Sequence, residues 1–385
     1  MNSNLIPSEY ADIRPYAPDE LPAVFEELIA DEAFKAVVQQ VMPQVPFEGV
    51  AAQLRQCRTS LEVQKTFFYP LLKQLLATCS QGISMSLPDD MDRQQPHTFI
   101  SNHRDIVLDS AFLAVLLVEN GFPTTVEIAI GDNLLIYPWI KKLVRVNKSF
   151  IVQRSLSMRE MLRASQTMSR YMHFAVSEKH ENIWIAQREG RAKDSNDRTQ
   201  DSILKMMAMG GEGTVIERLK QLNICPLAIS YEYDPCDFLK AQEFQQKRDI
   251  EGFTKSRADD LQNMQTGIFG QKGRIHYHVA PCINAWLDQI DPATPKTELF
   301  TLIAQHIDSE IHRHYRIYPV NSVAADLLQG TDKRSNSYNE ADRKAFESYV
   351  ESRIAKVQLP QPDHDFLRER ILTMYANPLI NQENA

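Results

Sequence analysis

The chain has 385 residues, of which 42 are Lys or Arg and 50 are Asp or Glu, so its formal net charge is −8. Apolar residues make up 43% and charged residues 24%, which is typical of a globular protein, and the length suggests two or three structural units or one enlarged domain. The acidic balance argues against nucleic-acid binding, because phosphate contacts need a basic surface. No apolar stretch approaches the roughly 20 residues that span a bilayer.

Two further features bear on the compartment. The first ten residues lack a basic region followed by an apolar run, so we predict no secretory signal. The cysteines are odd in number and lack the spacing of metal ligands: Cys57, Cys79, Cys225, Cys236 and Cys282. Scattered thiols of this kind fit a reducing environment better than a disulfide framework, and we expect a cytoplasmic protein.

The first 95 residues predict a helical and acidic region. Apolar side chains recur at helical spacing over 21–41 and over 61–76, where Pro70 predicts a kink. Residues 1–40 carry eight acidic side chains and only two basic ones. The polar stretch 88–96 predicts the boundary with the next region.

From residue 96 onward, strands and helices alternate. Short apolar runs predict strands at 98–101, 149–153, 183–186, 224–230 and 275–279. This alternation predicts an α/β core over 96–292, with a central, mostly parallel or mixed sheet flanked by helices. The charge-rich stretch 233–271 predicts a helical insertion, and residues 293–385 predict a helical C-terminal extension.

The stretch 99–110 carries the most informative chemical pattern. A short strand leads into a polar turn with His103, and the helix that follows has Asp109 in its first turn. An imidazole in a turn is well placed for proton transfer, and Asp105 is a good helix N-cap. Six residues at 100° each would put His103 and Asp109 about 120° apart on one helix, so they can meet only if His103 precedes it. The alternative is that the two acids serve the helix start and His103 is an ordinary loop residue. Spacing alone leaves both interpretations open.

This stretch resembles the first block of the glycerophospholipid acyltransferases, the superfamily of lysophosphatidic acid and glycerol-3-phosphate acyltransferases. Their signature is Asn-His followed, after four residues, by Asp. Here Asn102 and His103 are followed by Asp109 after five residues. We therefore expect Asp109 to be the partner of His103, with Asp105 as the alternative.

Three further blocks follow in the family's order, and the resemblance extends over about half of the chain, from 97 to 283. The second block, SFIVQR, ends at Arg154, and the fourth, ICPLAIS at 224–230, resembles a Val-Pro-Val-Ala-Ile strand. The third block, IAQREGRAK at 185–193, lacks the family's Thr-Arg order but keeps four polar or flexible residues: Glu189, Gly190, Arg191 and Lys193.

The resemblance implies an O-acyltransferase in which His103 is the general base and Asp109 fixes its tautomer. It also implies roles for the later blocks: Arg154, Arg191 and Lys193 would bind the substrate phosphate, and Glu189 and Gly190 would shape the acceptor pocket.

The implied reaction moves a fatty acyl group from acyl-CoA or acyl carrier protein, as co-substrate, to a glycerolipid acceptor. The simplest acceptor is 1-acylglycerol-3-phosphate, which gives phosphatidic acid, and no metal or organic cofactor is implied. Glycerol-3-phosphate or a lyso-aminolipid remains open as the acceptor, and so does an inactive lipid-binding module. The pair His276 and His278 lacks a Cys or carboxylate pattern to complete a metal site, so we predict structural histidines there.

A basic stretch near the second block predicts contact with lipid. Residues 139–170 contain eight basic side chains and a single acidic one, Glu160. Apolar residues such as Trp139, Met158 and Leu162 lie among them. This mixture suits an anionic membrane surface, although a solvated helix face is the alternative. We expect peripheral attachment to the cytoplasmic face of the inner membrane.

Overall fold

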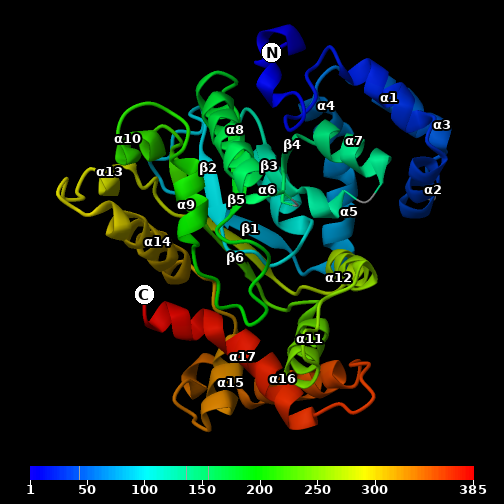
Figure 1. The fold of residues 1–385 in the computed structure, drawn as a ribbon. Coiled ribbons are helices and arrows are strands. Elements are labelled where there is room, and N and C mark those ends of the chain that lie inside the picture. Colours follow the sequence, from blue (N-terminus) through cyan, green and yellow to red (C-terminus); the bar gives the residue numbers. More distant parts are fainter. Residues whose placement is uncertain (43, 136, 155) are drawn as a thin grey trace.

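The computed structural model describes residues 1–42, 44–135, 137–154 and 156–385. Within these ranges seven strands form one sheet in the order β1-β7-β6-β2-β5-β3-β4 (Figure 1). Neighbouring strands are parallel except β6 and β7, which are antiparallel. This confirms the predicted α/β fold. The strands are β1 (Ile83–Ser86), β2 (Thr98–Ser101), β3 (Val126–Gly131), β4 (Ser149–Val152), β5 (Asn182–Ala186), β6 (Ile224–Tyr231) and β7 (Ile275–Val279).

Helices precede, connect and follow these strands. Before β1 lie η1 (Ser3–Leu5), η2 (Ser8–Tyr10), α1 (Leu21–Ile29), α2 (Glu32–Val41), α3 (Phe47–Gln56), α4 (Ser60–Val63), the π-helical segment η3 (Gln64–Phe68) and α5 (Tyr69–Cys79). Between β2 and β7 lie α6 (Leu108–Glu119), η4 (Asp132–Leu134), α7 (Pro138–Val146), α8 (Met158–Ser177), α9 (Asp201–Met207), α10 (Val215–Lys220), α11 (Asp237–Asp249) and α12 (Arg257–Phe269). After β7 come α13 (Asn284–Leu287), α14 (Lys296–Arg313), α15 (Pro319–Gln329), η5 (Ser335–Ser337), α16 (Glu340–Ile354) and α17 (His364–Glu383).

Helices cover both faces of the sheet, which explains why its central strands are buried along their whole length. All four residues of β2 and all eight of β6 are buried. Because side chains alternate along a strand, Phe99 packs on one face with α5 and α6, whereas Ile100 packs on the other with α8 and α14.

Two strands were not predicted, and one of them corrects a boundary. β1 lies inside the range 1–95, yet Ile83 pairs with Ile275 of β7, so the helical N-terminal region ends before residue 83 and not at 95. Serines alternate with Ile83 and Met85 in β1, so this strand has no continuous apolar run. β3 contains Glu127, a buried acid that accepts a hydrogen bond from Tyr171 (2.5 Å) and interrupts the apolar pattern.

The predicted helices also differ in detail. The range 21–41 forms two helices, because Asp31 accepts hydrogen bonds from the N–H groups of Ala33 and Phe34 and so starts a new helix at α2. From α4 to α5 the helical path runs through the π-helical segment η3 just before Pro70, which has no N–H to donate. The stretch 233–271 contains α11 and α12, as predicted.

The N- and C-terminal helices lie at opposite ends of the molecule (Figure 1). Helices α1 to α3 share an apolar cluster with α7, and α15 to α17 share another with α11. Among the residues that the structure describes, no helix combines the length and the apolar character needed to cross a bilayer.

Candidate active site

The candidate site begins where β2 ends. Asn102 follows the last residue of this strand, and its side chain bridges to β6. Its Oδ1 accepts a hydrogen bond from the N–H of Ile229 (2.8 Å), and its Nδ2 donates to the Ile229 carbonyl (2.9 Å). The amide thus acts as one further rung of the sheet and fixes the direction in which the chain leaves β2.

His103 and Asp109 meet across the loop that follows. Asp109 is fully buried in the first turn of α6, and its Oδ2 lies 2.8 Å from Nδ1 of His103. The same oxygen accepts hydrogen bonds from the N–H groups of Arg104 (2.7 Å) and Asp105 (3.1 Å), while Oδ1 accepts one from the hydroxyl of Tyr231 (3.2 Å). His103 precedes the helix, so the pair satisfies the geometric condition set by its spacing.

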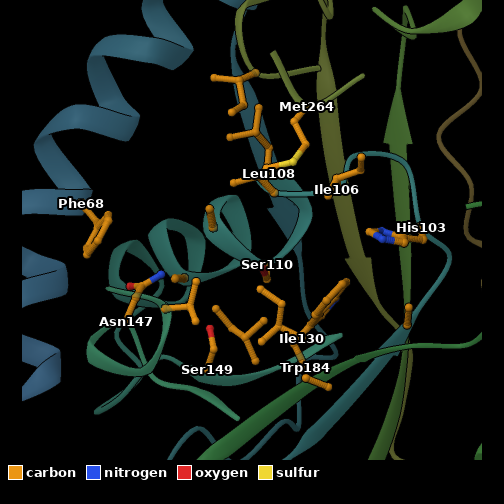
Figure 2. Close-up of a pocket in the computed structure, with 18 of the residues that line it drawn as sticks. Phe68, His103, Ile106, Leu108, Ser110, Ile130, Asn147, Ser149, Trp184 and Met264 are labelled. Carbon is orange, nitrogen blue, oxygen red and sulfur yellow. The ribbon is translucent and has the colours of Figure 1, made fainter. Parts of the chain in front are cut away.

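These contacts decide which nitrogen of His103 can act as a base. Because a carboxylate only accepts hydrogen bonds, the proton of the neutral imidazole lies on Nδ1 and the lone pair on Nε2. Within the described chain no hydrogen bond reaches Nε2. The imidazole packs edge-on against Trp184, with ring centroids 5.6 Å apart, and it lines a large cavity (Figure 2). It can therefore take a proton from a hydroxyl bound there.

Asp105, the alternative partner, has a different task. Its Oδ1 accepts hydrogen bonds from the N–H groups of Val107 (2.9 Å) and Leu108 (2.8 Å) and so holds the start of α6. It is buried against Gly267 of α12, where an added Cβ would lie only 2.3 Å from Oδ2. Burial and, after it, the nearby charge of Asp109 raise the pKa of Asp105. The structure hydrogen-bonds His103 to Asp109 and not to Asp105.

The cavity beside His103 has a volume of about 700 Å³. Small and branched side chains at helical spacing on α6 form one wall: Ala111, Ala114, Val115 and Val118. Residues of α5, β3 and α12 form much of the rest. Figure 2 places Phe68, Asn147 and Ser149 on the side of the pocket away from His103. A mostly apolar cavity that runs from a base into the protein suits a hydrocarbon chain.

The predicted polar residues of the second and third blocks line this same cavity: Arg154, Glu189, Gly190, Arg191 and Lys193. Arg154 follows β4 and pairs with Glu189 at 3.0 Å, both on the surface. Arg191 donates to the side-chain oxygen of Asn263 on α12 (3.3 Å). Gly190 has a φ of 66°, a left-handed conformation that favours glycine in this turn. The structure thus brings together on one cavity residues separated by up to 90 positions.

Lys193 differs from the two arginines because its partner is a buried carboxylate. It forms an ion pair with Glu243 of α11, a buried carboxylate that also pairs with Lys247 (3.0 Å) and Lys255 (2.8 Å). Burial lowers the pKa of Lys193 to about 8, against the opposing effect of Glu243. Its charge is therefore less available to a substrate than those of Arg154 and Arg191.

Comparison with known proteins bears on this arrangement. The family model described as Acyltransferase matches residues 82–230, a range that contains β1 to β5, all of β6 except its last residue, and the His103–Asp109 pair. Residues 82–230 are therefore similar to the acyltransferase family. This confirms the resemblance expected from the motifs. No curated protein matches the chain significantly. The crystal structure of PlsC, the 1-acyl-sn-glycerophosphate (LPA) acyltransferase from Thermotoga maritima, aligns with 10% identity and a TM-score of 0.39, covering 76% of this chain and 95% of that one.

Several residues around the candidate site could not be predicted from the sequence. The hydroxyl of Tyr231 binds the Asp109 carboxylate, and that of Tyr277 donates to the Asp109 carbonyl (3.0 Å). Lys255 and Met264, from the insertion around α12, line the cavity. None of these residues carries a local signal, because each lies more than a hundred positions from Asp109.

The predicted membrane contact over 139–170 needs correction, because this stretch does not form one basic face. Arg145 is buried and donates to the carbonyls of Arg14 and Ala11, both at 2.7 Å. Lys148 is buried as well and pairs with Glu181 (2.6 Å). Three more basic side chains form surface ion pairs: Lys142 with Glu27, Arg154 with Glu189 and Arg170 with Glu9. The exposed basic side chains that remain are Lys141, Arg159 and Arg163.

Proposed function

We propose that this protein transfers a fatty acyl group from a thioester, acyl-CoA or acyl carrier protein, to the hydroxyl of a glycerophospholipid precursor. The acceptor that fits most simply is 1-acylglycerol-3-phosphate, with phosphatidic acid as the product. The observation that carries the proposal is the position of His103, hydrogen-bonded to Asp109, at a cavity that is apolar inside and flanked by Arg154 and Arg191.

The reaction needs one base and no enzyme nucleophile. Nε2 of His103 takes the proton of the acceptor hydroxyl as its oxygen attacks the thioester carbonyl carbon. The tetrahedral adduct collapses, the C–S bond breaks, and the thiolate leaves with the proton that His103 then returns. Asp109 holds the imidazole in the required tautomer and stabilises the imidazolium between these steps.

The surroundings of His103 match the two halves of such a substrate pair. The apolar wall on α6 suits the acyl chain, because burying hydrocarbon is favourable by about 0.8 kcal/mol for each CH₂. The guanidinium groups of Arg154 and Arg191 suit a phosphate, since their planar forks present paired donors.

One assay tests the proposal. The purified protein and its His103→Ala variant are incubated with radiolabelled acyl-CoA or acyl carrier protein and a panel of acceptors: 1-acylglycerol-3-phosphate, glycerol-3-phosphate and a lyso-aminolipid. We expect labelled phosphatidic acid from the parent protein and none from the variant. Transfer to one of the other acceptors instead would show that 1-acylglycerol-3-phosphate is not the substrate. Lipid binding without turnover would contradict the proposed enzymatic activity and support a lipid-binding module.

We also propose that the first turns of α8 dock on an anionic membrane. Six consecutive residues, 158–163, are exposed. Among them Met158 is 89% exposed, and Leu162 lies in the same turn as Arg159 and Arg163. Apolar side chains beside cations suit a surface of negatively charged lipids, from which a lipid acceptor enters the site. This segment begins four residues after Arg154, which lines the cavity. Attachment would be peripheral, on the cytoplasmic face.

A further inference from the structure

Arg104, the residue after His103, points away from the cavity into the protein. Its side chain is buried, with Nη1 donating to the hydroxyl of Ser195 (2.5 Å) and Nη2 lying 3.8 Å from Oδ2 of Asp234. A buried guanidinium is costly unless carboxylates compensate it. Burial alone would lower the pKa of Arg104, but Asp234 and Asp197 outweigh this effect and raise it. The charge is therefore kept inside the protein.

The backbone of Arg104 belongs to the site itself. Its N–H donates to Oδ2 of Asp109 at 2.7 Å, and the same oxygen binds Nδ1 of His103. A shift of Arg104 therefore moves a donor of the carboxylate that orients the imidazole. Arg104 thus connects two parts of the protein: its side chain contacts the buried Asp234, and its backbone N–H binds Asp109, the partner of His103.

The C-terminal helices contact Asp234 and its neighbours, which bind the side chain of Arg104. The N–H of Asp234 donates to the hydroxyl of Tyr375 on α17 (3.0 Å), and that hydroxyl donates to Asp237 (2.9 Å). Arg353 of α16 forms a buried ion pair with Asp237, and Lys240 pairs with Asp234 (2.5 Å). Although burial alone would raise it, Lys240 and Arg104 lower the pKa of Asp234 to about 2, so this carboxylate stays charged.

We infer that Arg104 is a positioning residue through which the C-terminal helices α16 and α17 hold the His103–Asp109 pair in its working geometry. The inference rests on the proposed acyl transfer for its effect on rate. It assigns a task to the C-terminal extension, which lies outside the range 82–230 that matches the acyltransferase family. The extension is then part of the active-site scaffold and not only an added cover.

The test uses two variants and one matched control in the full-length protein. Arg104→Lys keeps the charge but loses the fork that reaches both Ser195 and Asp234. Tyr375→Phe keeps every charge and the aromatic ring and removes only the hydroxyl beside Asp234. It therefore tests the inference even if Arg104→Lys folds poorly. The control is Tyr338→Phe, which removes a hydroxyl bound to Asp326 (3.0 Å) elsewhere in the same extension.

Two readouts separate positioning from simple stability. The first is proton NMR of the imidazole Nδ1–H bound to Asp109, assigned by its disappearance in His103→Gln. The second is kcat, KM and the pH profile of acyl transfer. We expect Arg104→Lys to broaden or shift the Nδ1–H resonance, to lower kcat by about tenfold or more with little change in KM, and to move the acidic midpoint of the pH profile. Tyr375→Phe should act in the same direction, and Tyr338→Phe should not.

Each result has a defined meaning. If Arg104→Lys and Tyr375→Phe leave the resonance and kcat unchanged and lower only the melting temperature, as the control does, the inference is overturned. If the parent protein transfers no acyl group, the proposed function fails, while the resonance still shows whether the C-terminal helices position His103.

Discussion

The Oδ2 atom of Asp109 lies 2.8 Å from Nδ1 of His103 although five residues separate them along the chain. The extra residue relative to the family's spacing is accommodated in the loop, where Oδ2 also accepts two backbone N–H groups. We therefore expect Asp109→Asn to lower kcat by about 10²–10⁴-fold, because an amide favours the wrong tautomer of His103.

Asp105→Asn is the matched comparison, since it changes a second buried acid in the same loop. Its Oδ1 binds only the N–H groups that start α6, so the expected result is a lower melting temperature with kcat reduced far less than in Asp109→Asn. Rate measurements on both variants settle the assignment; a collapse of kcat in the Asp105 variant alone would reverse it.

The phosphate of the acceptor should depend more on the arginines than on Lys193. Arg191→Ala is expected to raise KM for 1-acylglycerol-3-phosphate by about tenfold, and Lys193→Ala by less, because Lys193 already pairs with Glu243. Steady-state kinetics with 1-acylglycerol, which lacks the phosphate, provide the comparison. Equal losses for both acceptors would exclude phosphate binding by Arg191. Arg313→Ala, on the exposed side of α14, is the control.

The cavity should limit the acyl chain. Ala114 lies on the cavity wall of α6, so Ala114→Leu fills part of the space that we assign to the chain. We expect kcat/KM to fall by about tenfold for long-chain donors and little for short ones, because each excluded CH₂ forfeits about 0.8 kcal/mol. Competition between long and short donors measures the ratio. An unchanged ratio, matching that of the exposed Ala285→Leu, would place the chain elsewhere.

Membrane docking should depend on the start of α8. Reversing two charges, Arg159→Glu with Arg163→Glu, is expected to weaken binding to phosphatidylglycerol vesicles by more than about tenfold at low salt, since each basic residue contributes about 1 kcal/mol near such a surface. Vesicle sedimentation measures it. The control reverses exposed Lys333 and Lys356 near the C-terminal helices. If both double variants sediment equally, α8 is not the contact.

Stability should fall in acid because of buried histidines. Burial lowers the pKa of His276, His278 and His312 to about 4, against about 6.5 in an unfolded chain. Between these values the unfolded chain binds more protons, so the free energy of unfolding decreases as the pH falls from about 6.5 towards 4.

Thermal denaturation across this window checks the sign. The melting temperature of His312→Gln should depend less steeply on pH, since a full proton is worth about 1.4 kcal/mol per pH unit. The exposed His364→Gln should keep the slope of the parent protein. A slope that is the same in all three proteins would show that buried imidazoles do not cause the loss.

Local patterns were sufficient where a site is built from neighbours in the chain. Strand, turn and helix follow one another within 99–110, so the placement of His103 before α6 could be inferred from spacing and capping. The later blocks each end a buried strand, and carboxyl ends of parallel strands meet at one edge of a sheet, which explains why Arg154 and Arg191 reach the same cavity.

Contacts between distant segments could not be inferred in this way. Tyr231 supports Asp109 from 122 positions away, and its strand pattern is that of any buried strand. Charge counts fail for a related reason: they do not show which way a side chain points. Arg145 and Lys148 look like surface charges in the sequence, but buried partners hold them inside.

The position of β7 in the sheet makes the segment 82–230 dependent on residues beyond it. The family match ends at residue 230, yet β7 lies between β6 and β1, and within the described chain β1 joins the sheet through β7. A chain cut after residue 230 would leave β1 detached and the fully buried β6 as an open edge, the kind of edge that recruits other chains. Residues 82–230 therefore lack a strand that the complete sheet needs, and the seven-stranded sheet can form only in a chain that extends through Val279.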